Sequence, residues 1–167
     1  NGNEVPSQVI SVMNNQATIL FLARVPSVGF EVFDVRPVNQ KPDIKTGLSV
    51  TTASIENEYY KVTIDKKGDI AGIFDKKENK EMLSAPIRLA YFSNHSDIWP
   101  AWEITYSTVT KKPRAYVDNV INLDIVEQGP VRATLRIIRE KDGSVFTQYV
   151  SLAAGEAGEV VIRPNQQ

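Results

Sequence analysis

One short stretch of the chain gathers most of the residues that could do chemistry. The segment 93–104 contains both tryptophans and the only histidine, together with Asp97 and Glu103. Tryptophan faces can stack on pyranose rings while carboxylates bind hydroxyl groups, so this composition fits a sugar site. Large aromatic side chains also contribute most to cores and interfaces. A sugar contact by Trp99 and Trp102 and a packing role for the same rings therefore both stay open.

The spacing of Trp99 and Trp102 favours packing. Residues three apart on a strand point to opposite faces of a sheet, so the two rings could not form one platform. Pro100 lies between them and fits a bend or an edge position better than a regular central strand. We expect at least one ring to be largely buried, with the other near a surface that meets a part of the protein outside this chain.

The residue types argue against a metal site or a self-contained catalytic site. Zinc takes three or four ligands from His, Cys, Asp or Glu, whereas the chain has His95 alone and no cysteine. Hydrolysis of a glycosidic bond with retention needs two carboxyl groups about 5–5.5 Å apart across a cleft. Asp97 with Glu103, and Glu56 with Glu58, are close in sequence. Pairs of this kind arise by chance among 20 acidic residues, so we expect no catalytic residue and no metal ligand here.

Composition narrows the classes of partner. A net charge of -1 gives no electrostatic basis for binding nucleic acid. The longest apolar run, residues 19–23, is far too short to cross a bilayer. No phosphate-binding glycine loop, zinc-protease motif or serine-hydrolase motif occurs. We expect neither nucleic acid nor a membrane as a partner, and the absence of cysteine leaves the compartment undetermined.

Strands are the elements that must position these residues, because helical periodicity is almost absent. Segments 9–13 and 17–23 flank a turn-like cluster at 14–16. The segment 30–35 alternates apolar and charged residues, the pattern of a half-buried strand. Further predicted turns lie at 65–69, 77–80 and 141–144, and further predicted strands at 131–137 and 145–152.

The segment 131–137 alternates without error, so Val131, Ala133, Leu135 and Ile137 are expected to face one core. Residues 37–46 hold two prolines, three charges and no apolar period, which indicates a linker. The predicted organisation is a small β-unit at 1–37, a linker at 38–47 and the opening strands of a large sandwich at 48–167.

Three segments resemble, in order and spacing, the β-domains of family 38 glycoside hydrolases, the retaining α-mannosidases. The first is residues 19–30, ILFLARVPSVGF, similar to the small β-domain pattern V-L-F-x-A-x-V-P-x-L-G-Y. The second is residues 55–77, IENEYYKVTIDKKGDIAGIFDKK, similar to the start of the large β-domain. The third is IRLAYF at 87–92 followed by DIWPAWEI at 97–104, which resembles N-x-L-x-x-F-x-D-x-P-x-x-W-D-A-W-D-I.

The chain also departs from the family pattern. Pro100 and Glu103 stand where the family often has Asp, so roles of those carboxylates do not carry over. Residues 160–167 lack the expected V-D-W ending. We therefore expect that the chain stops inside the large domain or diverges there.

The resemblance implies an all-β fold, in which a small β-unit precedes part of a galactose-mutarotase-like supersandwich. It implies a parent enzyme whose N-terminal (β/α) barrel carries an aspartate nucleophile, an acid/base carboxylate and a zinc ion. No position of this chain matches the nucleophile or the zinc ligands, so zinc is expected in the missing catalytic domain. Tyr91 is the one residue to which a substrate-binding role carries over, since some members have a cleft-facing aromatic there.

The sequence thus predicts a non-catalytic piece of an α-mannosidase, whose partner is the catalytic barrel of the same polypeptide. One alternative is a free-standing carbohydrate-binding sandwich with Trp99, Trp102 and Tyr91 as its platform, and another is a purely structural sandwich. The exposure of the two tryptophan side chains distinguishes these three interpretations. A platform exposes both rings in a row, a scaffold buries them, and a domain cut from an enzyme leaves an apolar patch uncovered.

Overall fold

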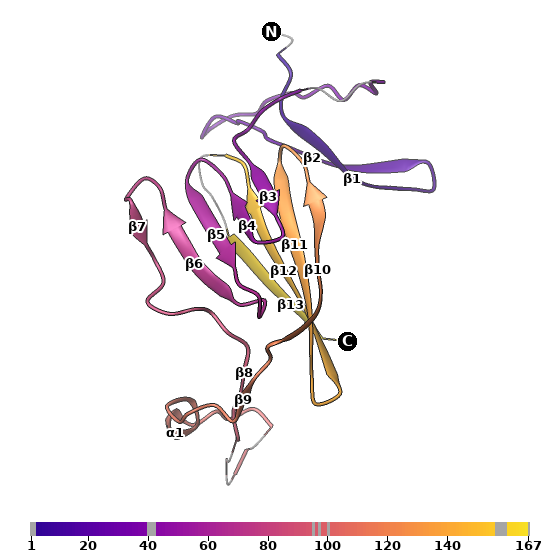
Figure 1. Cartoon of the computed structure of the whole chain (residues 1–167). Helices are drawn as coiled ribbons and strands as arrows, with labels where there is room; N and C mark the ends of the chain where they lie inside the picture. The colour runs from indigo at the N-terminus through magenta and orange to yellow at the C-terminus, as the bar shows by residue number, and fades with distance from the viewer. Residues whose placement is uncertain are drawn as a thin grey trace.

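The computed structural model describes residues 3–39, 43–94, 96, 98, 99, 101–155 and 160–166, the last range by its backbone alone. Two antiparallel sheets account for most of it (Figure 1). The predicted all-β fold is confirmed, because the single helix in these residues, α1 (Tyr106–Val109), has four residues. None of the described helical structure is long and apolar enough to span a membrane.

Both sheets are meanders in which strands adjacent in sequence pair antiparallel. The first sheet consists of β3 (Ser49–Thr51), β4 (Ser54–Glu56), β5 (Tyr60–Ile64), β6 (Ile70–Asp75) and β7 (Lys80–Glu81). The second consists of β10 (Asn119–Gln128), β11 (Arg132–Lys141), β12 (Ser144–Ala153) and β13 (Val160–Gln166). This order keeps pairing local along the chain.

The predicted turns are confirmed, and their residues supply the backbone angles that the hairpins need. Asp142 and Gly143 have φ of 52° and 79° between β11 and β12, the two positive values of a type I′ turn, whose twist matches the flanking strands. Gly68 has φ of 74° in the β5–β6 turn. Asn79, with φ of 50°, lies in the turn before β7.

The two sheets pack face to face around one core, which confirms the predicted sandwich. The odd-numbered residues Val131, Ala133, Leu135 and Ile137 are buried as the alternation predicted, with at most 6% of any side chain exposed. Three of them, Ala133, Leu135 and Ile137, belong to the core that the two sheets share. The other buried apolar residues of this core are Val50, Ile55, Val62, Ile64, Ile70, Val150 and Leu152. Burial of one large aliphatic side chain contributes about 1.5–3 kcal/mol, so this shared layer is what holds the sheets together.

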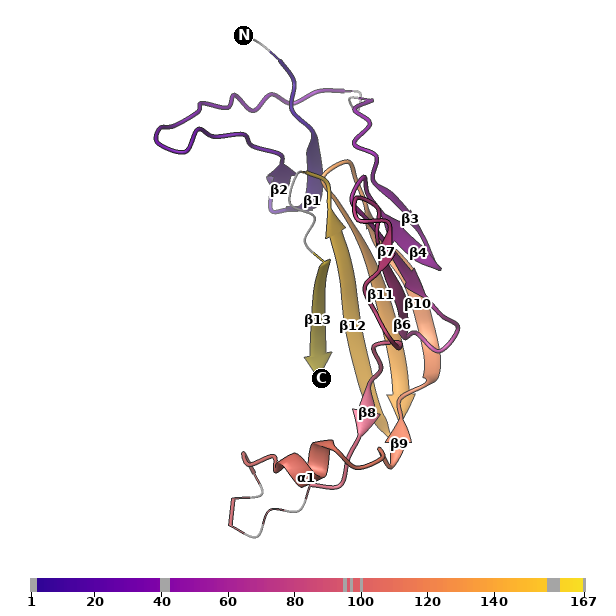
Figure 2. The same cartoon turned by 90° about the vertical axis from the view of Figure 1, so that its left-hand side faces the viewer.

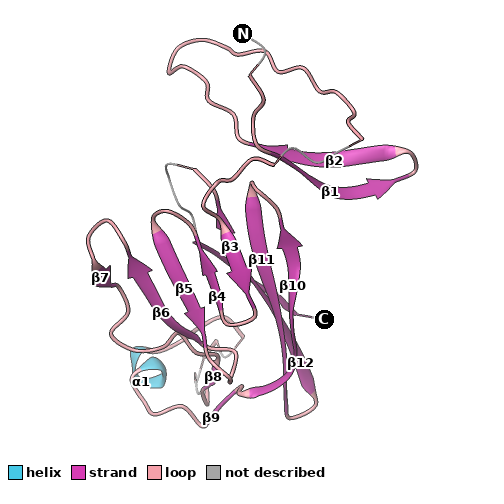
Figure 3. Cartoon of the chain, turned by 45° about the horizontal axis from the view of Figure 1, so that its top comes forward, coloured by secondary structure: helices cyan, strands magenta, loops and turns pink. Residues whose placement is uncertain are grey.

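A separate hairpin precedes the sandwich. It pairs β1 (Ser7–Met13) with β2 (Gln16–Phe21) and lies beyond one end of the two sheets (Figure 3). The predicted strand at 30–35 is wrong: this segment belongs to no strand in the described part of the chain. A strand needs a neighbour for its backbone groups, and no described segment lies alongside it in register. The linker at 38–47 stays a prediction.

The hairpin is held to the sandwich by polar contacts at the β10–β11 turn. The Gln8 amide oxygen accepts hydrogen bonds from the backbone N–H of Val131 at 3.3 Å and of Arg132 at 2.9 Å. A Cβ on Gly129 would lie 2.0 Å from the Gln8 side chain. A larger residue at 129 would therefore displace the amide that makes these bonds.

Asn57, a polar residue near the start of the 55–77 segment, links the two sheets through its side-chain amide. Its side-chain oxygen accepts from the N–H groups of Tyr59 at 2.8 Å and Tyr60 at 2.7 Å, which shapes the turn between β4 and β5. Its side-chain nitrogen donates to the carbonyl of Ala153 at 2.9 Å, at the end of β12. Asn57 is 1% exposed, so one buried amide fixes a turn of the first sheet against the second.

A buried ion pair makes a second link between the sheets. Asp69, in the β5–β6 turn, accepts from Arg139 Nη1 of β11 at 2.7 Å through Oδ1. Its Oδ2 accepts from Arg88 Nε at 2.9 Å. Arg139 also donates to the carbonyls of Lys67 and Val117. Asp69 and Arg139 are almost fully buried, and burial lowers the pKa of the Arg139 guanidinium despite its partner.

We expect Asp69→Asn to lower the free energy of unfolding by about 3–5 kcal/mol, because it leaves the Arg139 charge buried without a counter-ion. Asp142→Asn is the matched control. It makes the same chemical change at an exposed turn residue with positive φ, which Asn tolerates. Urea denaturation of both variants measures the difference. Equal unfolding midpoints would show that the buried charge pair contributes nothing.

The outer face of the second sheet carries a two-armed ion pair. Arg132 Nε and Nη2 each donate to Glu127 at 2.6 Å, and the Thr134 hydroxyl donates to the same carboxylate. The hydrogen bonds from Arg132 lower the pKa of Glu127 below its ordinary 4.5, although burial opposes this. The folded state therefore favours the ionised carboxylate.

A depressed pKa in the folded state predicts stability that is present above the unfolded pKa and is lost as pH falls through the folded value. We expect the free energy of unfolding to be level from neutral pH towards the ordinary pKa of 4.5 and to fall below it. Glu127→Gln should reduce the difference in stability between pH 7 and pH 3. Arg132→Gln should act alike, since it removes the cause of the shift. Parallel pH profiles for all three proteins would contradict this account.

Candidate functional site

The tryptophan-bearing segment leaves the sandwich at the end opposite to the β1–β2 hairpin. Strand β8 (Ala90–Tyr91) pairs with β9 (Ala115–Tyr116), and the chain between them, residues 92–114, projects beyond both sheets (Figures 1 and 2). We call residues 92–114 the aromatic loop. It carries α1, and the structure describes all of it except residues 95, 97 and 100.

Trp99 and Trp102 stack on each other and are both exposed. Their ring centroids are 5.1 Å apart at an interplanar angle of 22°, and 52% and 72% of the side chains are exposed. The expectation that one ring would be buried is therefore wrong. The two lie on a helix-like turn, where the Trp99 carbonyl accepts from the N–H of Glu103 at 2.9 Å. Residues three apart are neighbours on such a turn, whereas a strand would have separated them.

Polar side chains of the aromatic loop fasten this turn. The Ser96 hydroxyl donates to the Glu103 carboxylate and accepts from the Trp99 N–H at 3.1 Å. The Asn94 side chain donates to the Glu103 carbonyl at 3.1 Å. Glu103 is thus engaged in holding the loop. Asp97, considered above as a partner carboxylate of Glu103, lies outside the described residues, and so does Pro100.

The base of the aromatic loop is anchored to the buried ion pair. The Arg88 guanidinium lies over the Tyr116 ring, 3.5 Å from its centroid, and donates to Asp69. The hydrogen bond to Asp69 raises the pKa of Arg88. Ile87 pairs with Ile70 of β6 through two backbone hydrogen bonds of 2.9 and 3.2 Å. The start and the end of the loop therefore meet at one fixed point of the sandwich.

Most apolar side chains of the aromatic loop face solvent. Besides the two tryptophans, the exposed ones are Phe92, Ile98, Ile104, Tyr106 and Val109. We call these seven residues the loop patch. Single apolar residues scattered over a surface are normal, whereas seven exposed ones within one loop of 23 residues call for an explanation.

Tyr91 lies at the foot of the aromatic loop, half-buried. Its ring meets Phe146 of β12 edge-on, with centroids 6.0 Å apart at 80°. The substrate-binding role predicted for Tyr91, and the sugar contacts predicted for Trp99 and Trp102, stay predictions.

The carboxylates considered for catalysis are engaged, exposed or outside the described chain. Glu56 Oε1 lies 2.7 Å from Lys76 Nζ, and the hydrogen bond from Lys76 lowers the pKa of Glu56. Glu58 is exposed and Glu103 is bound to Ser96. His95 lies outside the described residues. Among those that are described, no three His, Cys, Asp or Glu side chains are placed to hold a metal ion.

Sequence reasoning missed the polar residues that fix the aromatic loop. Arg139 continues the odd-numbered, core-facing series of β11 beyond Ile137. A charge at an inward position was a signal that a buried partner exists, because buried charges are paired. Nothing in the sequence names Asp69 as that partner, which lies 70 residues away.

Comparison with known proteins places this architecture in a family. Residues 55–160 match the family described as Glycosyl hydrolases family 38 C-terminal domain. The chain is 24% identical over 157 residues to "Alpha-mannosidase G" of Dictyostelium discoideum, with 84% of the chain and 14% of that protein covered. It is 32% identical over 94 residues to "Lysosomal alpha-mannosidase" of Bos taurus, with 54% of the chain and 9% of that protein covered.

The chain therefore spans about a seventh of the first relative and about a tenth of the second. The family match begins at Ile55 within β4 and reaches the first residue of β13, so it covers most of both sheets and the aromatic loop between them. The chain belongs to glycoside hydrolase family 38 and corresponds to the family's C-terminal domain.

Proposed function

We propose that this chain is a non-catalytic β-sandwich part of an α-mannosidase. In this proposal it packs against the catalytic barrel of the same polypeptide and shapes one wall of the substrate cleft. The observation that carries the proposal is the loop patch: seven apolar side chains on a loop that its own hydrogen bonds and an ion pair hold in place. A surface built this firmly suits a permanent contact within one polypeptide.

The small share of the relatives' length supports the same conclusion. If this chain alone were the enzyme, all catalytic groups would have to lie within a length that covers 14% of "Alpha-mannosidase G". Of the carboxylates considered for catalysis, Glu56 pairs with Lys76 and Glu103 binds Ser96. We place the nucleophile, the acid/base residue and the zinc ion of the activity in the remainder of the protein.

The patch should matter only when the rest of the protein is present. We expect Trp102→Ser to change the stability of the isolated chain by no more than about 1 kcal/mol, since it removes only an exposed aromatic pair. In the full-length protein the same change should weaken docking of this domain by about 2 kcal/mol or more, as for a central interface tryptophan. Thermal unfolding, together with turnover of an aryl α-mannoside, measures the two effects.

Lys112→Ser is the control for this experiment. Lys112 is an exposed charged residue of the same loop and does not belong to the loop patch. It should leave both the isolated chain and the full-length protein unchanged. An intact full-length enzyme carrying Trp102→Ser, with normal stability and normal turnover, would exclude the loop patch as the contact with the barrel.

A carbohydrate-binding role is the second candidate, and exposure of both tryptophans is the observation that favours it. The geometry is less suited to a platform than exposure alone suggests. At 5.1 Å and 22° each ring covers a face of the other, so the pair offers two single faces pointing apart. A row of rings side by side, as a sugar chain would need, is not formed.

We therefore expect no saturable change in tryptophan fluorescence when the isolated chain is titrated with mannose or mannobiose. A Trp99→Ala variant that still folds provides the comparison. Saturable quenching at low millimolar sugar in the parent chain, lost in Trp99→Ala, would favour the binding module over the docking surface.

A further inference from the structure

We propose that two β-bulges in β10 close the free edge of the second sheet to strand addition, so that no further strand pairs with β10. Strand β10 lies at the margin of its sheet and pairs with β11 alone in the described part of the chain (Figure 1). The inference goes beyond the proposed function and does not rest on it, because it concerns neither the aromatic loop nor a catalytic barrel.

An open edge as long as β10 is a hazard for a soluble chain. The strand has ten residues, about twice the mean length of a strand. An edge strand presents a row of unpaired N–H and C=O groups to which a strand of another chain can pair. Ile121, Ile125 and Val126 add apolar side chains that are 52%, 36% and 40% exposed. A long edge with apolar residues of this kind favours association between chains.

The residues of β10 supply few of the usual protections. Proteins blunt an edge with a short strand, with lysine or proline, with free charges or with a bulge. The sequence of β10, NVINLDIVEQ, contains neither lysine nor proline. Its two carboxylates are held in ion pairs with β11, Asp124 with Arg136 and Glu127 with Arg132, each at 2.6 Å. Among the devices that the strand itself can carry, the bulges remain.

The register of β10 against β11 is interrupted at two places, and both extra residues belong to β10. Ile121 and Val126 have no partner on β11, while the residues on either side of each are paired. A bulge of this kind bends its strand and increases the local twist. The two bends divide the edge, so a straight partner strand could follow it without interruption only over residues 122–125 or at its two ends.

Packing between β10 and β11 does not require the two extra residues. Without Ile121 and Val126, the rest of β10 would alternate regularly between the two faces of the sheet. Residues opposite core-facing positions of β11 are Val120, Leu123, Ile125 and Gln128, and residues opposite outer-face positions are Asn122, Asp124 and Glu127. Both extra side chains are exposed. The shape that they give to the edge therefore accounts for them better than contacts in the core do.

The other edges of the two sheets carry other protections. The first sheet ends in β3, of three residues, and in β7, of two, and strands this short offer few backbone groups for pairing. The strand of the second sheet farthest from β10 is β13, which includes Pro164, a residue without a backbone N–H. In the described chain, each edge of the two sheets is thus limited by its own device, and bulges are the device of β10.

Deletion of both Ile121 and Val126 tests the proposal directly. Every remaining residue of β10 keeps its present partner on β11, so this variant of the chain should fold. Its straightened edge can pair with that of a second copy. We expect it to self-associate about tenfold more tightly than the parent chain, or more, which corresponds to about 1.4 kcal/mol of added pairing. Sedimentation equilibrium at several protein concentrations measures both association constants.

The matched control carries Ile121→Ala and Val126→Ala together. It shortens the same two side chains but keeps the length of β10 and hence both bulges, so it should associate no more tightly than the parent chain. A deletion variant that folds and associates no more than the parent would overturn the proposal. So would an alanine variant that associates as tightly as the deletion variant, because the side chains and not the bulges would then protect the edge.

Amide hydrogen exchange, resolved to single residues, tests the same edge without any deletion. A strand with one antiparallel neighbour bonds only about half of its amides to that neighbour. Roughly half of the β10 amides should therefore exchange fast, equally in the isolated chain and in the full-length protein, while β11 amides are protected in both. Protection of nearly all β10 amides in the full-length protein would show that a strand pairs with this edge and would overturn the proposal, whether or not the deletion variant folds.

Discussion

A single buried carboxylate, shared by two arginines, is the constraint on which the arrangement depends. Asp69 sits in a turn of the first sheet, Arg139 on the inner face of the second, and Arg88 at the base of the aromatic loop. Removing these charges from water is costly, and the mutual attraction repays it only when the geometry is right. The sheets cannot slide, and the loop cannot swing at its base, without leaving a charge unpaired in the core.

At the other end of the sandwich, two neutral side chains also fix the position of one segment against another. The Asn57 amide joins the β4–β5 turn to the end of β12, and the Gln8 amide joins the N-terminal hairpin to the β10–β11 turn. Each satisfies backbone groups that would otherwise be buried without partners, which carries a larger free-energy cost than a lost exposed contact. Apolar burial holds the layers together, and these polar contacts decide their relative position.

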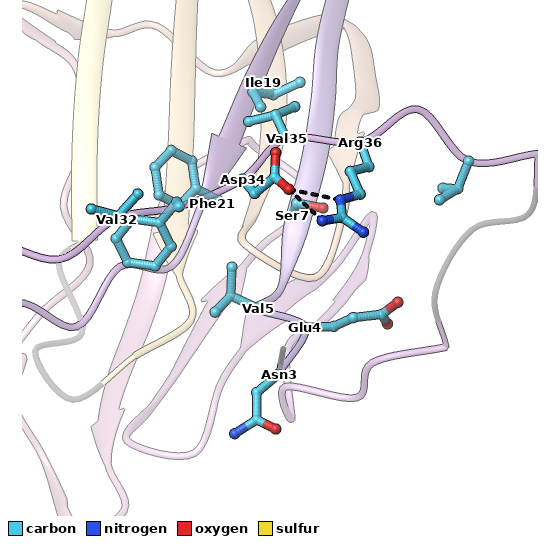
Figure 4. A pocket seen from close by; sticks show the side chains of 12 residues that line it. Asn3, Glu4, Val5, Ser7, Ile19, Phe21, Val32, Asp34, Val35 and Arg36 are labelled. Atoms are coloured by element: carbon cyan, nitrogen blue, oxygen red, sulfur yellow. Dashed lines mark hydrogen bonds and ion pairs between the residues drawn. The ribbon is translucent and has the colours of Figure 1, made fainter. Parts of the chain in front are cut away.

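The fold is thereby a rigid centre with uncovered apolar surface at both ends. The aromatic loop lies at one end and the β1–β2 hairpin at the other (Figure 2). The first carries the loop patch, and an open hollow of about 460 Å³ lies beside the second (Figure 4). Loops and accessory units on a stable scaffold commonly carry the interactions of a domain. The match to the glycoside hydrolase family 38 C-terminal domain covers most of this scaffold and the whole of the aromatic loop.

Much of the fold was predictable from the sequence, because strand alternation and turn residues act locally. The core face of β11 follows from the period of two at Ala133, Leu135 and Ile137, and the hairpin at Asp142-Gly143 follows from backbone angles those residues adopt readily. The strand expected at 30–35 failed because a strand exists only with a neighbour. The burial expected for at least one of Trp99 and Trp102 failed because a turn replaced the strand. The stacked tryptophans and the Asp69 ion pair were decided by tertiary structure alone, since they depend on which distant segments meet in space.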